Sequence, residues 1–178
     1  MPWKNGGGET LEVAISPADA GIAAFDWRIS MAVVAADGAF SAFPGADRTL
    51  TLLDGEGMTL AVAGESPILL TSDSAPCVFP GDVATTATLV GGPITDLNVM
   101  TARGRYTHVV ARSTAPRALH AGPHETLLIL GDGVAVEAAA ESVTLGLRDF
   151  AMLESGETAY VCPASTAAWL LVTIRPVD

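Results

Sequence analysis

The chain has 178 residues, enough to bury the core of one large domain or of two small ones. It carries 20 Asp and Glu against 9 Lys and Arg, a formal net charge of −11, which excludes a protein that binds nucleic acid or an anionic membrane through basic residues. Hydrophobic residues make up 49% and charged residues 16%, which excludes an intrinsically disordered chain.

Short stretches of alternating apolar and polar residues predict β-strands along the whole chain. In chain order the clearest are residues 10–15, 49–53, 58–62, 134–137 and 169–174. Turn signals separate them, at Asp54-Gly55, Gly64-Glu65, Pro80-Gly81-Asp82, Gly91-Gly92-Pro93 and Gly131-Asp132-Gly133. The 18 glycines and 11 prolines leave little room for long helices, and only the alanine-rich residues 138–142 would allow a helical turn. The sequence therefore predicts an all-β protein.

Two stretches of the chain resemble each other. Residues 48–57, RTLTLLDGEG, form an apolar strand that ends in Gly-acidic-Gly, and residues 124–133, HETLLILGDG, repeat this pattern. A repeat of about half the chain indicates two related supersecondary units. We therefore expect two related β-barrel lobes, each a double-sheet roll, in one compact unit that can share strands, with boundaries at residues 1–111 and 112–178.

The cysteines and the N-terminal residues indicate a cytoplasmic protein. Cys77 and Cys162 lack a C-x-x-C spacing, so two free thiols are expected, although a single disulfide stays open. The first ten residues contain no apolar run of the kind found in a signal peptide. The apolar residues 158–174 are interrupted by Pro163 and are too polar to span a bilayer. We expect no membrane partner and no nucleic-acid partner, and we leave a homodimer open.

The order of a strand, a Gly-x-Gly turn, a second strand and a later Gly-Asp turn resembles the cupin barrel, whose mouth holds a metal or a substrate. Cupins place two His and a Glu around the start of the first strand and a further His after the Gly-Asp turn. Here residues 40–48 contain no His, and Arg48 stands where the Glu would be. In the second half His120, His124 and Glu125 leave a metal site open, but no His lies near Ala167 to complete it. We expect no metal and no cofactor, and we expect His108 to lie on a strand.

The chain also carries motifs of one particular cupin-like family. It resembles the HutD/Ves family through five segments that occur in order, namely Trp3-Lys-Asn-Gly-Gly-Gly8, Phe25-Asp-Trp-Arg-Ile-Ser30, Phe40-Ser-Ala-Phe-Pro-Gly45 with Asp47-Arg48, Phe79-Pro-Gly-Asp82 and Asp96-Leu-Asn-Val-Met100. The resemblance implies a bicupin-like fold. It also implies a regulatory, ligand-binding role linked to bacterial histidine utilisation, with intermediates such as N-formylglutamate or urocanate as ligands.

Polar residues on alternating positions of two predicted strands suggest where such a ligand binds. Arg28 and Ser30 share one strand face, and Asp96, Asn98 and Met100 share another, because side chains alternate along a strand. Arg48 opens a neighbouring strand. A guanidinium inside a barrel needs a partner, and a ligand carboxylate matches its planar fork. The candidate ligand-binding residues are these six together with Lys4 and Asn5, which would close the mouth.

Three functions follow from this pattern. The leading one is a metal-independent protein that binds a small carboxylate metabolite and senses or buffers it. The second is a cofactor-free cupin isomerase or hydrolase that acts on a similar acid, although no G-x-S-x-G motif or Cys–His arrangement nominates a catalytic residue. The third is a structural or interaction protein in which Asp96 or Asp47 neutralises the arginines and no ligand binds.

Overall fold

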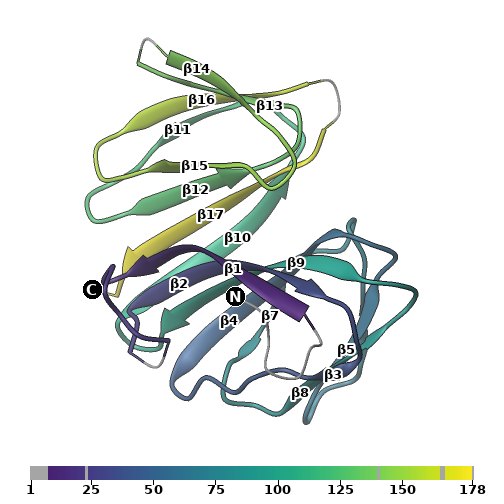
Figure 1. The fold of residues 1–178 in the computed structure, drawn as a ribbon. Coiled ribbons are helices and arrows are strands. Elements are labelled where there is room, and N and C mark those ends of the chain that lie inside the picture. Colours follow the sequence, from purple (N-terminus) through teal and green to yellow (C-terminus); the bar gives the residue numbers. More distant parts are fainter. Residues whose placement is uncertain (1–7, 23, 140, 165–166, 178) are drawn as a thin grey trace. The chain divides into compact units, whose positions relative to one another are not determined.

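The computed structural model describes residues 8–22, 24–139, 141–164 and 167–177 and divides the chain into two compact units, Met1–Tyr106 and Thr107–Asp178 (Figure 1). Strands make up the regular structure of these residues, and no helix among them is long and apolar enough to cross a membrane. The all-β class predicted from turn signals and alternation is confirmed. The division falls a few residues before the boundary expected from the repeat.

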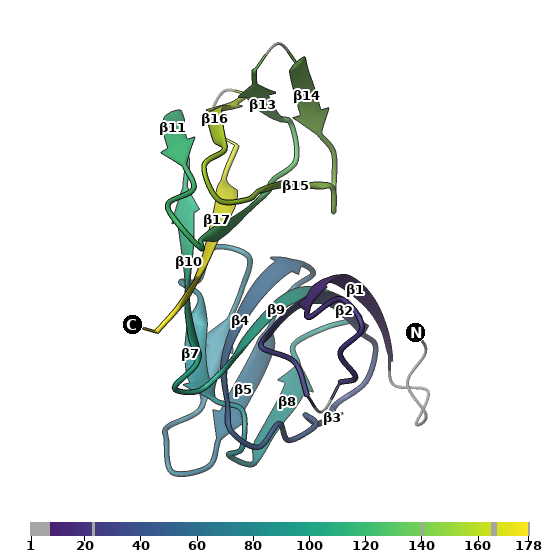
Figure 2. The ribbon, with the colours of Figure 1, turned by 90° about the vertical axis from the view of Figure 1, so that its left-hand side faces the viewer.

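The first unit is a roll of two antiparallel sheets. The larger sheet has five strands, in the order β1 (Gly8–Ser16), β2 (Trp27–Val34), β9 (Ile94–Ala102), β4 (Ala46–Asp54) and β7 (Cys77–Pro80). The smaller sheet has four, in the order β3 (Gly38–Ala39), β8 (Thr85–Leu89), β5 (Met58–Val62) and β6 (Ile68–Leu70). Strands β4 and β5 belong to the two different sheets (Figure 2). Both sheets supply the core, for example Leu50 and Leu52 from β4 and Met58 and Leu60 from β5.

The second unit is also built from two sheets. One has the order β10 (Tyr106–Ser113), β17 (Trp169–Pro176), β12 (Thr126–Leu130) and β15 (Phe150–Leu153). The other has the order β11 (Arg117–His120), β16 (Thr158–Pro163), β13 (Val134–Ala138) and β14 (Glu141–Leu145). Its core joins Ile129 and Trp169 of the first sheet to Val136 and Val161 of the second. The Trp169 indole Nε1 donates a hydrogen bond to the Ala115 carbonyl at 3.1 Å.

The two units have the same strand order. In unit 1 the paired strands run β2-β9-β4-β7 and β3-β8-β5-β6; in unit 2 they run β10-β17-β12-β15 and β11-β16-β13-β14. The two repeated stretches occupy equivalent places, because each forms the strand and turn that lead from one sheet into the other (β4 to β5, and β12 to β13). The expected pair of related double-sheet rolls is therefore present, and β1 is an additional edge strand of unit 1.

The predicted strands lie within observed ones. Residues 10–15, 49–53, 58–62, 134–137 and 169–174 fall in β1, β4, β5, β13 and β17. Where the alanine-rich residues would allow a helical turn, Ala138 of β13 instead pairs with Glu141 of β14 in a hairpin, and Ala139 has a φ of 53°. The pairing of β13 with β14 explains this, since a ladder of cross-strand hydrogen bonds outweighs the weak helix preference of a few alanines. Cys77 and Cys162 are free thiols.

Candidate functional site

The polar candidates of unit 1 lie on the inward face of its five-stranded sheet. In the strand register Met100 of β9 is the partner of Arg28 on β2 and of Arg48 on β4, so it separates the two arginines. One step along the same face, Asn98 is opposite Ser30, and one step further Asp96 is opposite Ala32. Ala32 belongs to the core of the roll, so this face points into its interior. The alternation predicted from the sequence is confirmed.

Arg48 is joined to Asp96 through the amide of Asn98. The Arg48 Nε donates a hydrogen bond to the Asn98 Oδ1 at 2.8 Å, and its Nη2 donates to the same oxygen. The Asn98 Nδ2 in turn donates to the Asp96 Oδ1. The amide therefore has its oxygen toward the cation and its nitrogen toward the carboxylate, which fixes the orientation of its side chain.

Aromatic rings enclose the Arg48 guanidinium. Its Cζ lies 4.4 Å from the ring centre of Phe40, 5.4 Å from that of Phe79 and 5.9 Å from that of Phe43. Such contacts stabilise a cation electrostatically. The pKa of Arg48 is lowered to about 10, chiefly by burial; the charge of Asp96 raises it and the charge of Arg28 lowers it. Arg48 thus remains a cation at neutral pH although it is only 5% exposed.

Asp96 is the most deeply buried charged group in the described part of the first unit, with no exposed surface. Within the part of the chain that the structure describes, its Oδ2 has no hydrogen-bond partner. Burial raises the pKa of this carboxyl to about 7, although the Arg48 charge and the Asn98 hydrogen bond both favour the ionised form. Asp96 therefore changes its charge close to neutral pH.

Arg28 is paired with a carboxylate that the sequence analysis did not select. Its Nε donates to the Glu12 Oε2 at 2.8 Å, and its Nη1 donates to the Ser30 Oγ at 3.3 Å. Glu12 lies on the edge strand β1, opposite Ser30 in the register. The sequence does place Glu12 inside the first predicted strand. It does not show that this strand pairs with β2, and without that pairing Glu12 cannot be assigned to Arg28.

The remaining candidates divide into two groups. Met100 is buried against Phe25 and Ala46 at one end of the roll, on the same face as the arginines. Lys4 and Asn5 lie outside the described residues, so their role in closing the mouth stays a prediction. Asp47, considered as a neutraliser of the arginines, instead accepts a hydrogen bond from the Arg103 Nε at 2.8 Å.

The histidines of the second unit do not gather. His120 ends β11, and His124 lies in the following turn with a φ of 60°. The Glu125 Oε2 accepts a hydrogen bond from the backbone N–H of Gly122 at 2.8 Å and so shapes that turn. Over residues 8–22, 24–139, 141–164 and 167–177 no group of three or more His, Cys, Asp or Glu side chains is arranged to hold a metal ion. His108 lies on strand β10, as expected.

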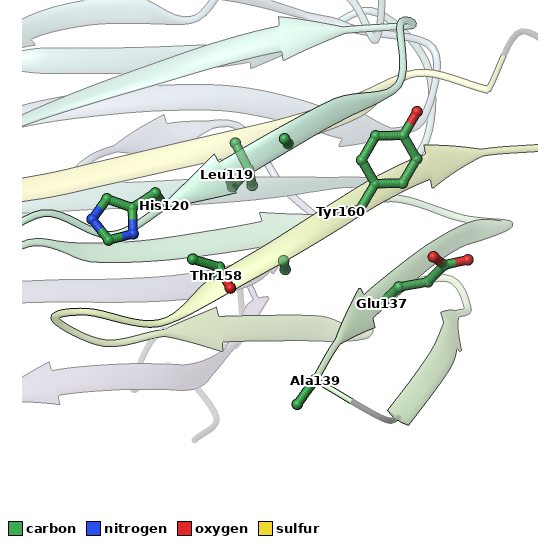
Figure 3. Close-up of a pocket in the computed structure, with 8 residues that line it drawn as sticks. Leu119, His120, Glu137, Ala139, Thr158 and Tyr160 are labelled. Carbon is green, nitrogen blue, oxygen red and sulfur yellow. The ribbon is translucent and has the colours of Figure 1, made fainter.

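A shallow hollow lies on the outer side of the β11-β16-β13 sheet (Figure 3). Its polar lining side chains are His120, Glu137, Thr158 and Tyr160. It is open to solvent, and its lining contains no buried charged group. The buried face of unit 1, with its two arginines, is therefore the stronger candidate site.

A family model described as HutD matches residues 1–172. The chain belongs to the HutD family. Its curated relatives include an uncharacterised 21.2 kDa protein in the hutC 3′ region of Pseudomonas putida, 36% identical over 88% of this chain and 83% of that protein. The protein Ves of Citrobacter koseri is 40% identical over 58% of this chain and about half of its own length, 53%. The family resemblance drawn from the five motifs is confirmed.

Two solved structures of Pseudomonas proteins match this chain over nearly its whole length. HutD from Pseudomonas fluorescens SBW25, in a formate condition, has a TM-score of 0.83 at 29% identity and covers 100% of this chain and 94% of its own. A conserved protein of unknown function from Pseudomonas aeruginosa PAO1 has a TM-score of 0.81 at 31% identity and covers 98% and 93%. A cupin barrel protein from Leptotrichia buccalis reaches a TM-score of 0.59 at 11% identity over 96% and 89%, which shows a cupin-like fold only.

Proposed function

We propose that this HutD-family chain is a cytoplasmic, metal-independent protein that binds a small carboxylate metabolite between Arg28 and Arg48. The observation that carries the proposal is the position of the two guanidinium groups on one buried face, on either side of Met100. The hydrogen bonds of Arg28 go to Glu12 and Ser30, and those of Arg48 go to Asn98. The two oxygens of a ligand carboxylate match the planar fork of a guanidinium group.

The relatives suggest the class of acid. One of them is named for its place in the hutC 3′ region, and another was solved in a formate condition. Intermediates of histidine degradation that carry a carboxylate, such as N-formylglutamate or urocanate, are therefore the first ligands to test. Binding would let the protein sense or buffer such an intermediate. Ser30 and Asn98 would add neutral hydrogen bonds, as expected from their positions on the same face.

One observation favours a structural role instead. Arg48, Asn98 and Asp96 form a continuous hydrogen-bonded series, which balances the buried Arg48 charge without a ligand. A protein that uses this series only to hold its sheet together would keep the same contacts and bind no acid. The two functions differ in one measurable property, which is the stabilisation of the fold by added carboxylates.

A thermal-unfolding panel separates these functions. The protein is heated with N-formylglutamate, urocanate, glutamate, histidine and formate, and each mixture is also analysed for chemical change of the added acid. A ligand at about 100 times its dissociation constant adds roughly 2.7 kcal/mol to the free energy of unfolding, which raises the midpoint by roughly 5–10 °C. A shift for one acid supports binding, and no shift with any of them favours the structural role. Turnover of the acid would identify an enzyme.

Variants locate the binding. Arg48→Lys keeps the positive charge but removes the planar fork, so the shift should disappear while the protein stays folded. Arg105→Gln is the matched control, because Arg105 is an exposed arginine of the same unit that pairs with Asp26. A shift that survives Arg48→Lys would place the ligand elsewhere and contradict the proposal.

A further inference from the structure

The buried polar face is already electrically balanced by the protein itself. It contains two cations, Arg28 and Arg48, and two carboxyl groups, Glu12 and Asp96. With both carboxyls ionised the sum of these charges is zero. An added carboxylate would leave an excess negative charge inside the roll, and an uncompensated buried charge is strongly unfavourable. Binding of an anion therefore requires that one of the two carboxyls changes its state.

The surroundings of Asp96 show which carboxyl can do so. Glu12 is about half exposed, 47%, and is paired directly with Arg28, so both water and the guanidinium stabilise its charge. Asp96 has no contact with water, and it reaches Arg48 only through the neutral amide of Asn98. Its Oδ2 has no hydrogen-bond partner among the described residues and is therefore able to hold a proton without losing a hydrogen bond.

Among the described residues, no other titratable group near this face competes for the role. The neighbouring strands β2 and β4 contribute the guanidinium groups of Arg28 and Arg48, and β1 contributes Glu12. On β7 the thiol of Cys77 packs against the same core, but burial raises its pKa, so it is neutral and stays neutral. The opposite sheet supplies apolar core side chains, among them Met58, Leu60, Val62, Leu70 and Ala87.

We propose that Asp96 takes up a proton when a carboxylate binds Arg48, so that the site accepts an anion and a proton together. This inference rests on the proposed function. In the free protein the positive charge of Arg48 stabilises ionised Asp96 through Asn98. A bound ligand carboxylate compensates this positive charge instead. Asp96 then binds a proton from solvent at its free Oδ2, the Arg48 charge is balanced by the ligand, and the buried face returns to neutrality. Because burial raises the pKa of Asp96 to about 7 before any ligand is present, Asp96 can bind this proton near neutral pH.

The coupling has a consequence for specificity. At pH values above the pKa of Asp96, each carboxylate bound must bring a proton, so its affinity falls by up to about tenfold per pH unit. A neutral amide of the same shape adds no charge and leaves Asp96 as it was. The preference for the acid over its amide should therefore be large at neutral pH and shrink as the pH rises.

Calorimetric titration tests the coupling. Formate and urocanate, each beside its amide, are titrated into the intact protein at about pH 8, where free Asp96 is mostly ionised, in phosphate and in Tris, which differ in heat of ionisation. The expected result is uptake of close to one proton per acid bound and none per amide. In Asp96→Asn, whose side chain mimics the protonated acid, the acids should bind without proton uptake and with an affinity that does not change between pH 7.5 and about 9.

The outcomes separate the two proposals. If either acid binds wild-type protein with the same heat in both buffers, the proton coupling is wrong while the binding function stands. If the wild-type protein binds neither acid in these titrations, the proposed function fails and the coupling fails with it. The wild-type buffer comparison needs no variant, so it decides the question even if Asp96→Asn does not fold. A proton uptake that persists in Asp96→Asn would assign it to another group and would also overturn the inference.

Discussion

Arg28 and Glu12 form an ion pair between β2 and β1, with the Arg28 Nε 2.8 Å from the Glu12 Oε2. The arginine side chain is 8% exposed and the glutamate 47%. A carboxylate of the protein therefore already occupies one side of the guanidinium that we assign to the ligand. A bound acid has to share Arg28 with Glu12 or displace it, so Glu12 limits the affinity of the site.

The substitution Glu12→Gln tests this competition. Removal of the negative charge should raise the affinity for the acid found in the thermal panel about tenfold, because Arg28 then lacks a charged partner. It should cost about 1 kcal/mol of stability, since the pair is half exposed and the amide can still accept a hydrogen bond. Calorimetric titration and urea unfolding measure the two effects. Glu9→Gln, an exposed glutamate on the same strand, should change neither, and weaker binding by Glu12→Gln would contradict the competition.

The inward polar face was predictable because it depends on alternation alone. A strand places residues two apart on one side, which groups Arg28 with Ser30 and Asp96 with Asn98 and Met100 whatever their neighbours are. The same rule counts against Asp47 as a partner of Arg48, because adjacent residues of a strand point to opposite faces. In the structure Asp47 is bonded to Arg103, away from the buried face.

The choice of partners could not be predicted in the same way. The Glu12–Arg28 pair depends on the register of β1 against β2, which shifts between Glu12 and Ala14. A register is fixed by the packing of the whole sheet and is not written into either strand. The repeat, by contrast, was visible because the same apolar strand and Gly-acidic-Gly turn occur in both halves, and it gave the shared strand order of the two units.

The pH dependence of stability provides a prediction for Asp96. Its pKa in the folded protein, about 7, lies above the value of about 3.9 for an unfolded chain. Between these values the folded state binds more protons, so Asp96 lowers the free energy of unfolding as the pH rises from about 4 to about 7, with no further change above. The substitution Asp96→Asn removes this slope. The free energy of unfolding of the variant, relative to that of wild type, should therefore increase by several kcal/mol as the pH rises from about 4 to about 7.

Urea unfolding of both proteins at several pH values measures this difference. The Asn98 amide keeps its acceptor in Asp96→Asn, because the new side chain still has a carbonyl oxygen toward Asn98. A constant difference between the two proteins from about pH 4 to about 8 would show that Asp96 is ionised throughout. That result would also remove the support for proton uptake at this residue.

The exposed cluster of Arg103, Asp47 and Asp82 gives a prediction that is independent of any ligand. Arg103 donates to Asp47 and to both carboxylate oxygens of Asp82, the latter at 3.0 and 3.2 Å. These hydrogen bonds hold the pKa of Asp82 down, to about 2, and their stabilisation is lost as the pH falls toward that value. In Arg103→Gln the pKa of Asp82 should return toward about 3.9, as measured by NMR titration of its carboxyl. Carboxylate binding should be unchanged, and a loss of binding would extend the site to this cluster.

The buried hydroxyl of Thr51 gives the last prediction. Its Oγ1 has no hydrogen-bond partner in the described ranges, and the residue is 2% exposed on the side of β4 that faces away from Asp96. A buried hydroxyl without a partner costs about 1–3 kcal/mol, and valine has nearly the same shape without the polar atom. The substitution Thr51→Val should therefore leave stability unchanged or raise it by about 1 kcal/mol. Thr49 is equally buried on the same side of β4 but has a polar partner, so Thr49→Val should be destabilising. Equal losses in the two variants, measured by urea unfolding, would mean that the Thr51 hydroxyl is hydrogen-bonded in solution.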